Sequence, residues 1–308
     1  MSTAGASSKR RRLFSEDARW ALVFIAPWLV GFVIFTAGPM LWSLAISFTK
    51  YNGIRPPVFA GLDNYARLLE DPKIPTALYN TAFYTLLHVP LQIIISLALA
   101  LMLIRVGRAA GFFRTVFDMP SVTPAVAIGT LFLLILSGDG LLNQALALVG
   151  IDGPFWLTDD AWIKPGIVIM SLWSLGSTVV IYFAALRNVP IELYEAARID
   201  GANAWQQFRH ITLPFISGAV FFTVIVNTIA SIQIFAEVFT MFFGLTRAGT
   251  GQESALFFVI YLFQKAFSDL NLGYASAMAW LLFGVIMAIT FVQIRLSRRF
   301  VYYEGEAR

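Results

Sequence analysis

Residues 190–214 read PIELYEAARIDGANAWQQFRHITLP and separate two long apolar stretches, 163–186 and 214–242. A simple turn needs only a handful of residues, so a connection of this length is expected to carry structure of its own. Pro190 can occupy the first turn of a helix, and Gly201 can end that helix in a left-handed conformation. The stretch therefore predicts a short helix that stops at a glycine.

A second short helix is predicted directly after that glycine. Asn203 offers an N-cap and Gln206 follows three residues later, which is the spacing of a capping box, for a helix of about two turns. This helix–glycine–helix element presents small and apolar side chains that a partner can approach closely: Leu193, Ala196, Ala197, Ile199, Ala202 and Trp205. Taken by itself, the pattern also fits an amphipathic hairpin that covers a membrane bundle.

The rest of the chain is more apolar than a water-soluble protein. Of its 308 residues, 58% are hydrophobic and 13% are charged, and the mean hydropathy is +0.73, whereas soluble domains are about a quarter charged. A membrane helix needs about 20 mostly apolar residues, and six segments meet this requirement: 20–48, 78–104, 116–137, 163–186, 214–242 and 274–296. We predict an all-α polytopic membrane protein with six transmembrane helices, the first of them uncleaved.

Lysine and arginine collect on one side of the predicted membrane. The N-terminus, the 105–115 loop, the 187–213 loop and the C-terminal tail hold 15 of them, whereas the other side holds 7. Cytoplasmic segments are enriched in these residues, so both termini are expected in the cytoplasm. The predicted transmembrane domain spans 16–300, preceded by a disordered basic N-terminus, 1–15, and followed by a cytoplasmic tail, 301–308.

Several kinds of chemistry are not expected in this chain. It has no Cys, which excludes thiol catalysis and Cys-based metal sites. Its two histidines, His88 and His210, are far apart in the sequence and lack the spacing of metal ligands. We therefore predict no metal site, no catalytic residue and no nucleic-acid partner. No Walker A sequence for binding ATP occurs either.

The spacing within the loop resembles a family signature. The matching positions are, in order, Glu195, Ala196 and Ala197, then Gly201 after three residues, then Ile211, Leu213 and Pro214 after nine more. This pattern resembles that of permease subunits of binding-protein-dependent ABC importers. Asp200 and Phe208 resemble the carbohydrate-importing branch, as do the runs Gly61–Tyr65, Asn80–Thr81 and Ala275–Ala277. The chain is most similar to the larger permease subunit of maltose-type and glycerol-phosphate-type importers, over about residues 20 to 297.

That resemblance implies a type I ABC importer permease, which is a transport subunit and not an enzyme. It implies that residues 190–214 form a coupling helix seated in an ATPase subunit, with contacts from Glu195, Ala196, Ala197, Asp200 and Gly201. The implied partners are a second permease, two ATPase subunits that bind ATP and magnesium, an extracytoplasmic sugar-binding protein and the lipid bilayer. This chain itself is expected to hold no cofactor, and its implied location is the bacterial or archaeal cell (inner) membrane. The short 138–162 outer loop puts an extra docking domain in doubt.

Polar residues gather near the predicted centre of the membrane. Counting about 1.5 Å per residue from the helix ends places five of them at that level: Gln92, Ser177, Thr178, Asn227 and Ser231. Four more lie within about two turns: Trp173, Ser174, Tyr182 and Gln233. Uncharged hydrogen-bonding groups and aromatic rings suit a neutral sugar, so these residues, apart from Ser174, are the predicted substrate-path residues. The same side chains could instead bond the helices to one another.

Two other functions fit less well. A permease for glycerol phosphate, a polyamine or another small solute is the alternative, although no Lys or Arg falls in the central third of any segment to hold a phosphate. An ion-coupled carrier or a membrane enzyme needs an ionisable residue deep in the bundle. The nearest candidates are His88 and Glu237, which are expected to be neither central nor mutually placed for chemistry. Glu237 is expected near the outer surface, as a gate, a binding-protein contact or an ordinary interfacial carboxylate.

Overall fold

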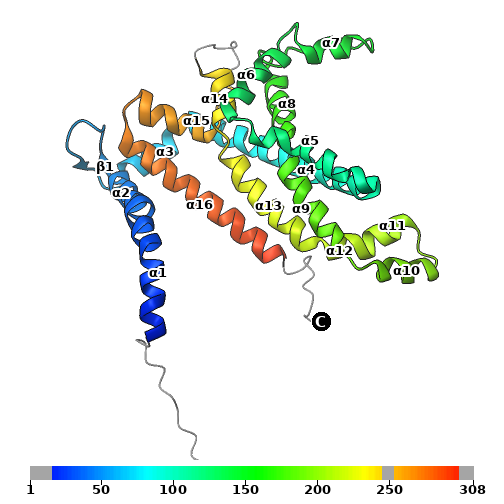
Figure 1. Cartoon of the computed structure of the whole chain (residues 1–308). Coiled ribbons are helices and arrows are strands. Elements are labelled where there is room, and N and C mark those ends of the chain that lie inside the picture. Colours follow the sequence, from blue (N-terminus) through cyan, green and yellow to red (C-terminus); the bar gives the residue numbers. More distant parts are fainter. Residues whose placement is uncertain (1–15, 245–252, 298–308) are drawn as a thin grey trace, which may run out of the picture.

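The computed structural model describes residues 16–244 and 253–297. Within these residues the chain is almost entirely helical, as predicted, and Figure 1 shows an open bundle from which the first helix stands apart. By length and apolar composition four helices can cross a membrane, and six spans result if each of two bent helix pairs counts as one. The predicted N-terminus 1–15 and tail 301–308 lie outside the described residues.

The first span is one long helical run. It consists of α1 (Glu16–Phe32), a π-helical turn (Val33–Ala37) and α2 (Gly38–Ser47). Pro27 lies inside α1 and does not end it. No residue in the most apolar window of Trp20–Ser47 is buried within the chain, whereas 22% to 33% of the corresponding window is buried in the other three long spans. The side chains of that window therefore face lipid or another protein, whereas the end of α2 is buried at Ile46 and Ser47.

Three further spans match the predicted segments, with shifts of a few residues at their ends. They are α4 (Lys73–Val106), which ends in a 3-10 turn (Gly107–Ala109), α13 (Ser217–Ile232) followed by α14 (Ala236–Phe242), and α16 (Leu272–Ser297). The chain leaves helical geometry between α13 and α14, where Phe235 has φ −144° and ψ −67°. This break shifts every later residue of the span away from the position that an unbroken helix predicts.

Two helices at a sharp angle replace the third predicted span. They are α5 (Ala110–Asp118), extended by a 3-10 turn (Met119–Val122), and α6 (Ala125–Ile135). The two meet at 98°, so the prediction of one helix over 116–137 is wrong. Thr123 is extended, with φ −74° and ψ 130°, because the ring of Pro124 disfavours the helical conformation of the residue before it.

The fourth span bends where another helix packs against it. It consists of α8 (Asp160–Ser171), a 3-10 turn (Leu172–Ser174) and α9 (Gly176–Arg187), with a bend of 52°. A Cβ on Gly176 would lie 2.2 Å from the carbonyl oxygen of Phe117 and 2.5 Å from Cα of Asp118. Only glycine permits this approach, so the bend is fixed against the end of α5.

Short elements connect the spans. They are an antiparallel hairpin of β1 (Thr49–Lys50) and β2 (Val58–Phe59), then α3 (Asp63–Glu70), α7 (Leu141–Ala147) and α15 (Phe258–Phe263), which continues as a π-helical turn (Gln264–Ser268). The buried Asn64 ties the hairpin down, because its Nδ2 donates to the carbonyl oxygens of Ser47 and Thr49, each at 2.8 Å.

Asp71 joins three helices just before α4 begins. Its Oδ2 accepts hydrogen bonds from the hydroxyls of Tyr261 on α15, at 2.6 Å, and Tyr274 on α16, at 2.7 Å. Burial opposes ionisation of this carboxyl group, but the bonds from Tyr261 and Tyr274 outweigh it and hold the pKa of Asp71 below its ordinary value. The carboxylate therefore stabilises the contact between these elements.

The 190–214 loop folds into short helices. These are α10 (Ile191–Ile199), α11 (Ala204–Gln207), a π-helical turn (Phe208–Thr212) and α12 (Leu213–Phe215). Figure 1 shows them at the same end of the bundle as the start of α1 and the last turn of α16. The hairpin of β1 and β2, α7 and α15 lie toward the opposite end.

Candidate functional site

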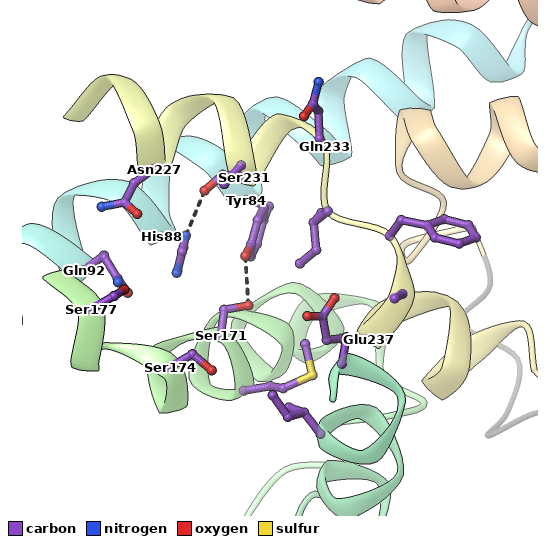
Figure 2. Close-up of a pocket in the computed structure, with 17 residues that line it drawn as sticks. Tyr84, His88, Gln92, Ser171, Ser174, Ser177, Asn227, Ser231, Gln233 and Glu237 are labelled. Carbon is purple, nitrogen blue, oxygen red and sulfur yellow. Dashed lines mark hydrogen bonds between the residues drawn. The ribbon is translucent and has the colours of Figure 1, made fainter. Parts of the chain in front are cut away.

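A cavity of about 480 Å³ lies between α4, α6, the α8–α9 bend and the α13–α14 break. Figure 2 shows polar side chains from three of these elements directed toward it. The polar lining residues are Tyr84, His88, Gln92, Ser171, Ser174, Ser177, Asn227, Ser231, Gln233 and Glu237. Ligand sites in proteins commonly enclose about 300–1,000 Å³, so the cavity is large enough for a small solute.

One face of α4 forms a polar wall of the cavity. Tyr84, His88 and Gln92 are spaced four residues apart, which places them one above another on a helix. The Tyr84 hydroxyl donates to Ser171 Oγ at 2.8 Å, and His88 Nδ1 lies 2.9 Å from Ser231 Oγ (Figure 2). The Tyr84 and His88 rings stack with centroids 5.1 Å apart. These contacts fix the two rings between α8 and α13.

Two polar atoms of this wall have no partner within the described part of the chain. They are His88 Nε2 and Gln92 Oε1, and both side chains are buried. The Gln92 amide donates only a long bond, 3.3 Å, to Thr178 Oγ1, and Asn227 Nδ2 lies 3.5 Å from the same oxygen. A buried polar group without a partner costs about 1–3 kcal/mol, so these two atoms leave an unmet need for a hydrogen bond in the described wall.

Glu237 reaches the cavity from the first turn of α14. Its backbone packs against α6 at Gly129, where a Cβ would lie 2.7 Å from the Glu237 carbonyl oxygen. The half-buried carboxylate has no hydrogen bond or ion pair with another described residue. The cavity lining contains no Lys or Arg from the described segments. The described wall is thus uncharged and hydrogen-bonding, apart from one carboxylate and the imidazole of His88.

The loop at the end of the bundle has the local geometry that the sequence predicts. Gly201 has φ +81°, and the Asn203 and Gln206 side chains and backbones form a reciprocal capping box at 2.8 and 2.9 Å. Two details differ. Pro190 caps α10 from outside and does not lie in its first turn, and the second helix is longer than predicted because α11 continues through a π-helical turn into α12.

The loop is anchored on one side and open on the other. The Tyr194 hydroxyl lies 2.9 Å from Thr212 Oγ1, and Tyr194 packs against the core between α4 and α9. In contrast, Ile199 is 88% exposed and Trp205 is 66% exposed. Because large apolar side chains rarely cluster in water without a partner, this open side is suited to contact with another protein.

Residues 92–302 match the family described as "Binding-protein-dependent transport system inner membrane component". The match covers more than half of the chain and includes the loop and most of the cavity. The chain belongs to this family. It is therefore a permease subunit of an ABC transport system and a multi-pass membrane protein, as the loop signature indicates.

The permease is similar to curated proteins over nearly its whole length. A probable ABC transporter permease, YesP of Bacillus subtilis, is 34% identical over 97% of the permease and 96% of that relative. The lactose transport system permease LacF of Rhizobium radiobacter is 33% identical over 97% and 99%. The fold is that of a bacterial alginate ABC transporter solved with its pentasaccharide-bound periplasmic protein, with a TM-score of 0.79 at 24% identity, covering 94% of the permease and 98% of that chain.

The permease brings five of the eight predicted substrate-path residues to the cavity: Gln92, Ser177, Asn227, Ser231 and Gln233. Gln233 lies at its edge, with its amide directed away from the others in Figure 2. The other three do not line it. Thr178 is buried behind the wall, Tyr182 is buried with its hydroxyl against Thr223 Oγ1, and Trp173 is 46% exposed beside Phe132.

The sequence prediction placed Ser174 near this depth without counting it as a substrate-path residue, and it missed four other polar residues of the cavity: Tyr84, His88, Ser171 and Glu237. His88 and Glu237, which were expected from the sequence to be neither central nor mutually placed for chemistry, both line this cavity. The residue count for Glu237 assumes an unbroken helix, whereas the chain leaves helical geometry at Phe235, just before α14. The four-residue spacing of Tyr84, His88 and Gln92 was the available signal for the wall on α4.

Proposed function

We propose that this permease imports a neutral sugar or oligosaccharide, forming half of the path through the membrane. The observation that carries the proposal is the cavity between α4, α9 and α13, whose polar lining is dominated by amide and hydroxyl groups and includes no Lys or Arg among the described residues. Sugar hydroxyls need both donors and acceptors, and amides supply both. The apolar part of the lining, such as Ile128 and Met170, can pack against the C–H faces of a sugar ring.

The named relatives support a sugar as the solute. LacF is a lactose permease, and NgcF of Streptomyces coelicolor, a diacetylchitobiose uptake permease, is 31% identical over 99% of this chain. Glycerol phosphate is disfavoured because the described cavity wall offers no cation for its phosphate. A polyamine remains the second candidate, since the Glu237 carboxylate provides an acceptor for an ammonium group.

In this proposal, energy comes from ATP that partner subunits bind and hydrolyse with magnesium, and the permease itself catalyses no reaction. Residues 190–214 carry the movement of the ATPase pair to α9, which ends just before this loop, and to α13, which begins just after it. Its contacts are assigned to Glu195, Ala196, Ala197, Asp200 and Gly201, which lie on the second half of α10 and at its end. The open side with Ile199 and Trp205 supports this role.

The assembly we propose contains a second permease, two ATPase subunits and an extracytoplasmic sugar-binding protein, in the inner membrane with both termini cytoplasmic. The distribution of Lys and Arg supports this orientation. The low burial of the most apolar window of the first span supports a further membrane subunit beside it.

Purification of the tagged permease from its own membranes, with mass spectrometry of the bound subunits, tests the assembly. The purified complex in proteoliposomes then tests the solute, with labelled lactose, a neutral pentose oligosaccharide, spermidine and glycerol 3-phosphate as probes. ATP-dependent uptake of a neutral sugar is expected. Uptake of spermidine or glycerol 3-phosphate alone would contradict the proposal.

A further inference from the structure

The charge of the solute is not fixed by the fold. The same fold occurs in an importer of the acidic polysaccharide alginate, so the class of sugar must depend on the side chains of the cavity. In this permease the titratable groups among the lining residues are Tyr84, His88 and Glu237. Tyrosine is neutral and the Glu237 carboxylate is negative, so only a protonated His88 could give the described wall a positive charge.

The position of Glu237 makes its charge effective inside the cavity. The carboxylate is half-buried and unpaired among the described residues, and its backbone is held by the close approach of α6 at Gly129. Figure 2 shows the Glu237 side chain pointing toward the part of the cavity where Ser171 and Tyr84 lie. Water screens a charge in such a hollow less than on an open surface, so one carboxylate acts over about 10 Å.

We infer that Glu237 makes the cavity selective against anions, so that the permease carries uncharged or amino-bearing glycans and excludes those with uronic acid groups. This inference rests on the proposed sugar import and names its substrate class. A carboxylate on the solute would approach Glu237 without a neighbouring cation from the described wall. An ammonium group would gain an acceptor, and a hydroxyl group would gain a strong, charge-assisted one.

The inference can be tested without knowing the solute, because the chain contains no Cys. A single Cys at Ser177, which is exposed and lines the cavity, reports the local potential through its reactions with two methanethiosulfonates of opposite charge. One carries a trimethylammonium group and the other a sulfonate. The ratio of their rates, divided by the same ratio for 2-mercaptoethanol, cancels both the intrinsic reactivities and any change in the thiolate fraction.

In the assembled transporter we expect this normalised ratio to favour the cation by roughly a hundredfold or more, because one charge at about 10 Å in an effective dielectric of about 20 changes each rate about tenfold or more, in opposite directions. Glu237→Gln should bring it close to one, whereas Glu237→Asp should keep it. Glu253→Gln provides a matched control, because Glu253 is exposed and does not line the cavity. A Cys at the exposed Leu148 should not respond to any of these changes.

A ratio near one in the background with Glu237 intact would overturn the inference, since a protonated His88 or a cation from another subunit would then cancel the carboxylate. A raised ratio that survives Glu237→Gln would overturn it as well. If Glu237→Gln does not assemble, the single-Cys protein with Glu237 intact is measured at increasing salt. Its ratio must fall as the salt concentration rises from about 0.05 to 0.5 M, because salt screens the carboxylate. Sugar uptake is measured separately, so a failure of the proposed import and a failure of the charge filter give different results.

Discussion

His88 Nδ1 lies 2.9 Å from Ser231 Oγ and joins α4 to α13 across the wall of the cavity. The bond occupies one nitrogen of the ring and leaves Nε2 without a partner in the described chain. The imidazole is thus held in a fixed orientation, and its second nitrogen is buried and unpaired among the described residues. The cavity is built from helices of both halves of the chain, so any motion of α13 relative to α4 changes it.

The turn at Gly201 predicts one effect on coupling. Gly201 has φ +81°, and no atom lies within 4 Å of a Cβ built there, so the backbone conformation and not space is the constraint. Gly201→Val should strain the turn by about 1–2 kcal/mol and reorient α10. Uptake and solute-stimulated ATPase activity should fall while the amount of complex in the membrane stays unchanged. Gly201→Asn, which tolerates this conformation better, should retain more activity, and full coupling by the valine variant would contradict the role of the loop.

The orientation of the permease predicts a labelling pattern. A Cys at Ile199, which is 88% exposed on α10, should react with a membrane-impermeant thiol reagent only in inside-out vesicles. A Cys at Leu69, which is 91% exposed on α3, should react only from the outer side of intact cells or spheroplasts. Labelling of Ile199 and Leu69 from the same side would refute the predicted topology.

Asn227 predicts a change in transport affinity with little loss of stability. Its only described side-chain bond, to Thr178 Oγ1, is long at 3.5 Å, so Asn227→Ala should barely change the melting temperature of the complex. Loss of one bond to a sugar costs about 0.5–1.5 kcal/mol, which should raise the half-saturation concentration of uptake roughly two- to tenfold.

Asn80 provides the matched control for that experiment. Its Nδ2 donates to the carbonyl oxygens of Glu253, at 2.8 Å, and Leu256, at 3.1 Å, and the residue is buried outside the cavity. Asn80→Ala should therefore lower the melting temperature by removing a helix–loop contact. An unchanged half-saturation concentration in Asn227→Ala, measured beside this control, would remove Asn227 from the site.

The contact between α6 and α14 predicts a steric defect. A Cβ on Gly129 would lie 2.7 Å from the Glu237 carbonyl oxygen and 3.0 Å from Thr240 Cβ, so Gly129→Ala must push α14 away. Overpacking of this kind costs about 1–3 kcal/mol of folding free energy, so we expect a lower melting temperature. Gly111→Ala on α5, where no atom lies within 4 Å, should leave stability equal or slightly higher. Equal melting temperatures for both variants would show that α14 yields freely at this point.

Asp71 predicts a dependence of stability on acid. Burial raises the pKa of Asp71 in the folded state, but the hydrogen bonds from Tyr261 and Tyr274 lower it by more, so the net pKa lies below the ordinary value. The ionised form therefore stabilises the folded state. This stabilisation is complete above an unfolded pKa of about 4 and is lost as the pH falls through the lower, folded value. Asp71→Asn should melt at a lower temperature than the parent at pH 7, and the difference should shrink below about pH 4. A difference that stays constant over this range would contradict the assignment.

The apolar segments and the geometry of the 190–214 loop follow from the sequence alone. Long apolar runs must be helical in a membrane, because lipid offers no partner to the backbone amides and carbonyls. The loop is equally local: Gly201 and the Asn203–Gln206 capping box act within a few residues of the chain, so their spacing carries the information. Residues so close in sequence adopt this geometry without help from distant parts of the molecule.

Only the tertiary structure decided which side chains meet. The bend at Gly176 depends on the backbone of α5 packed against it, and the place of Glu237 depends on the break before α14 and on Gly129 of α6. No periodicity within one segment encodes these contacts, because they join residues from different helices. A count along an ideal helix related Glu237 only to the start of its own span, whereas the broken and bent helices place it and His88 against the same cavity.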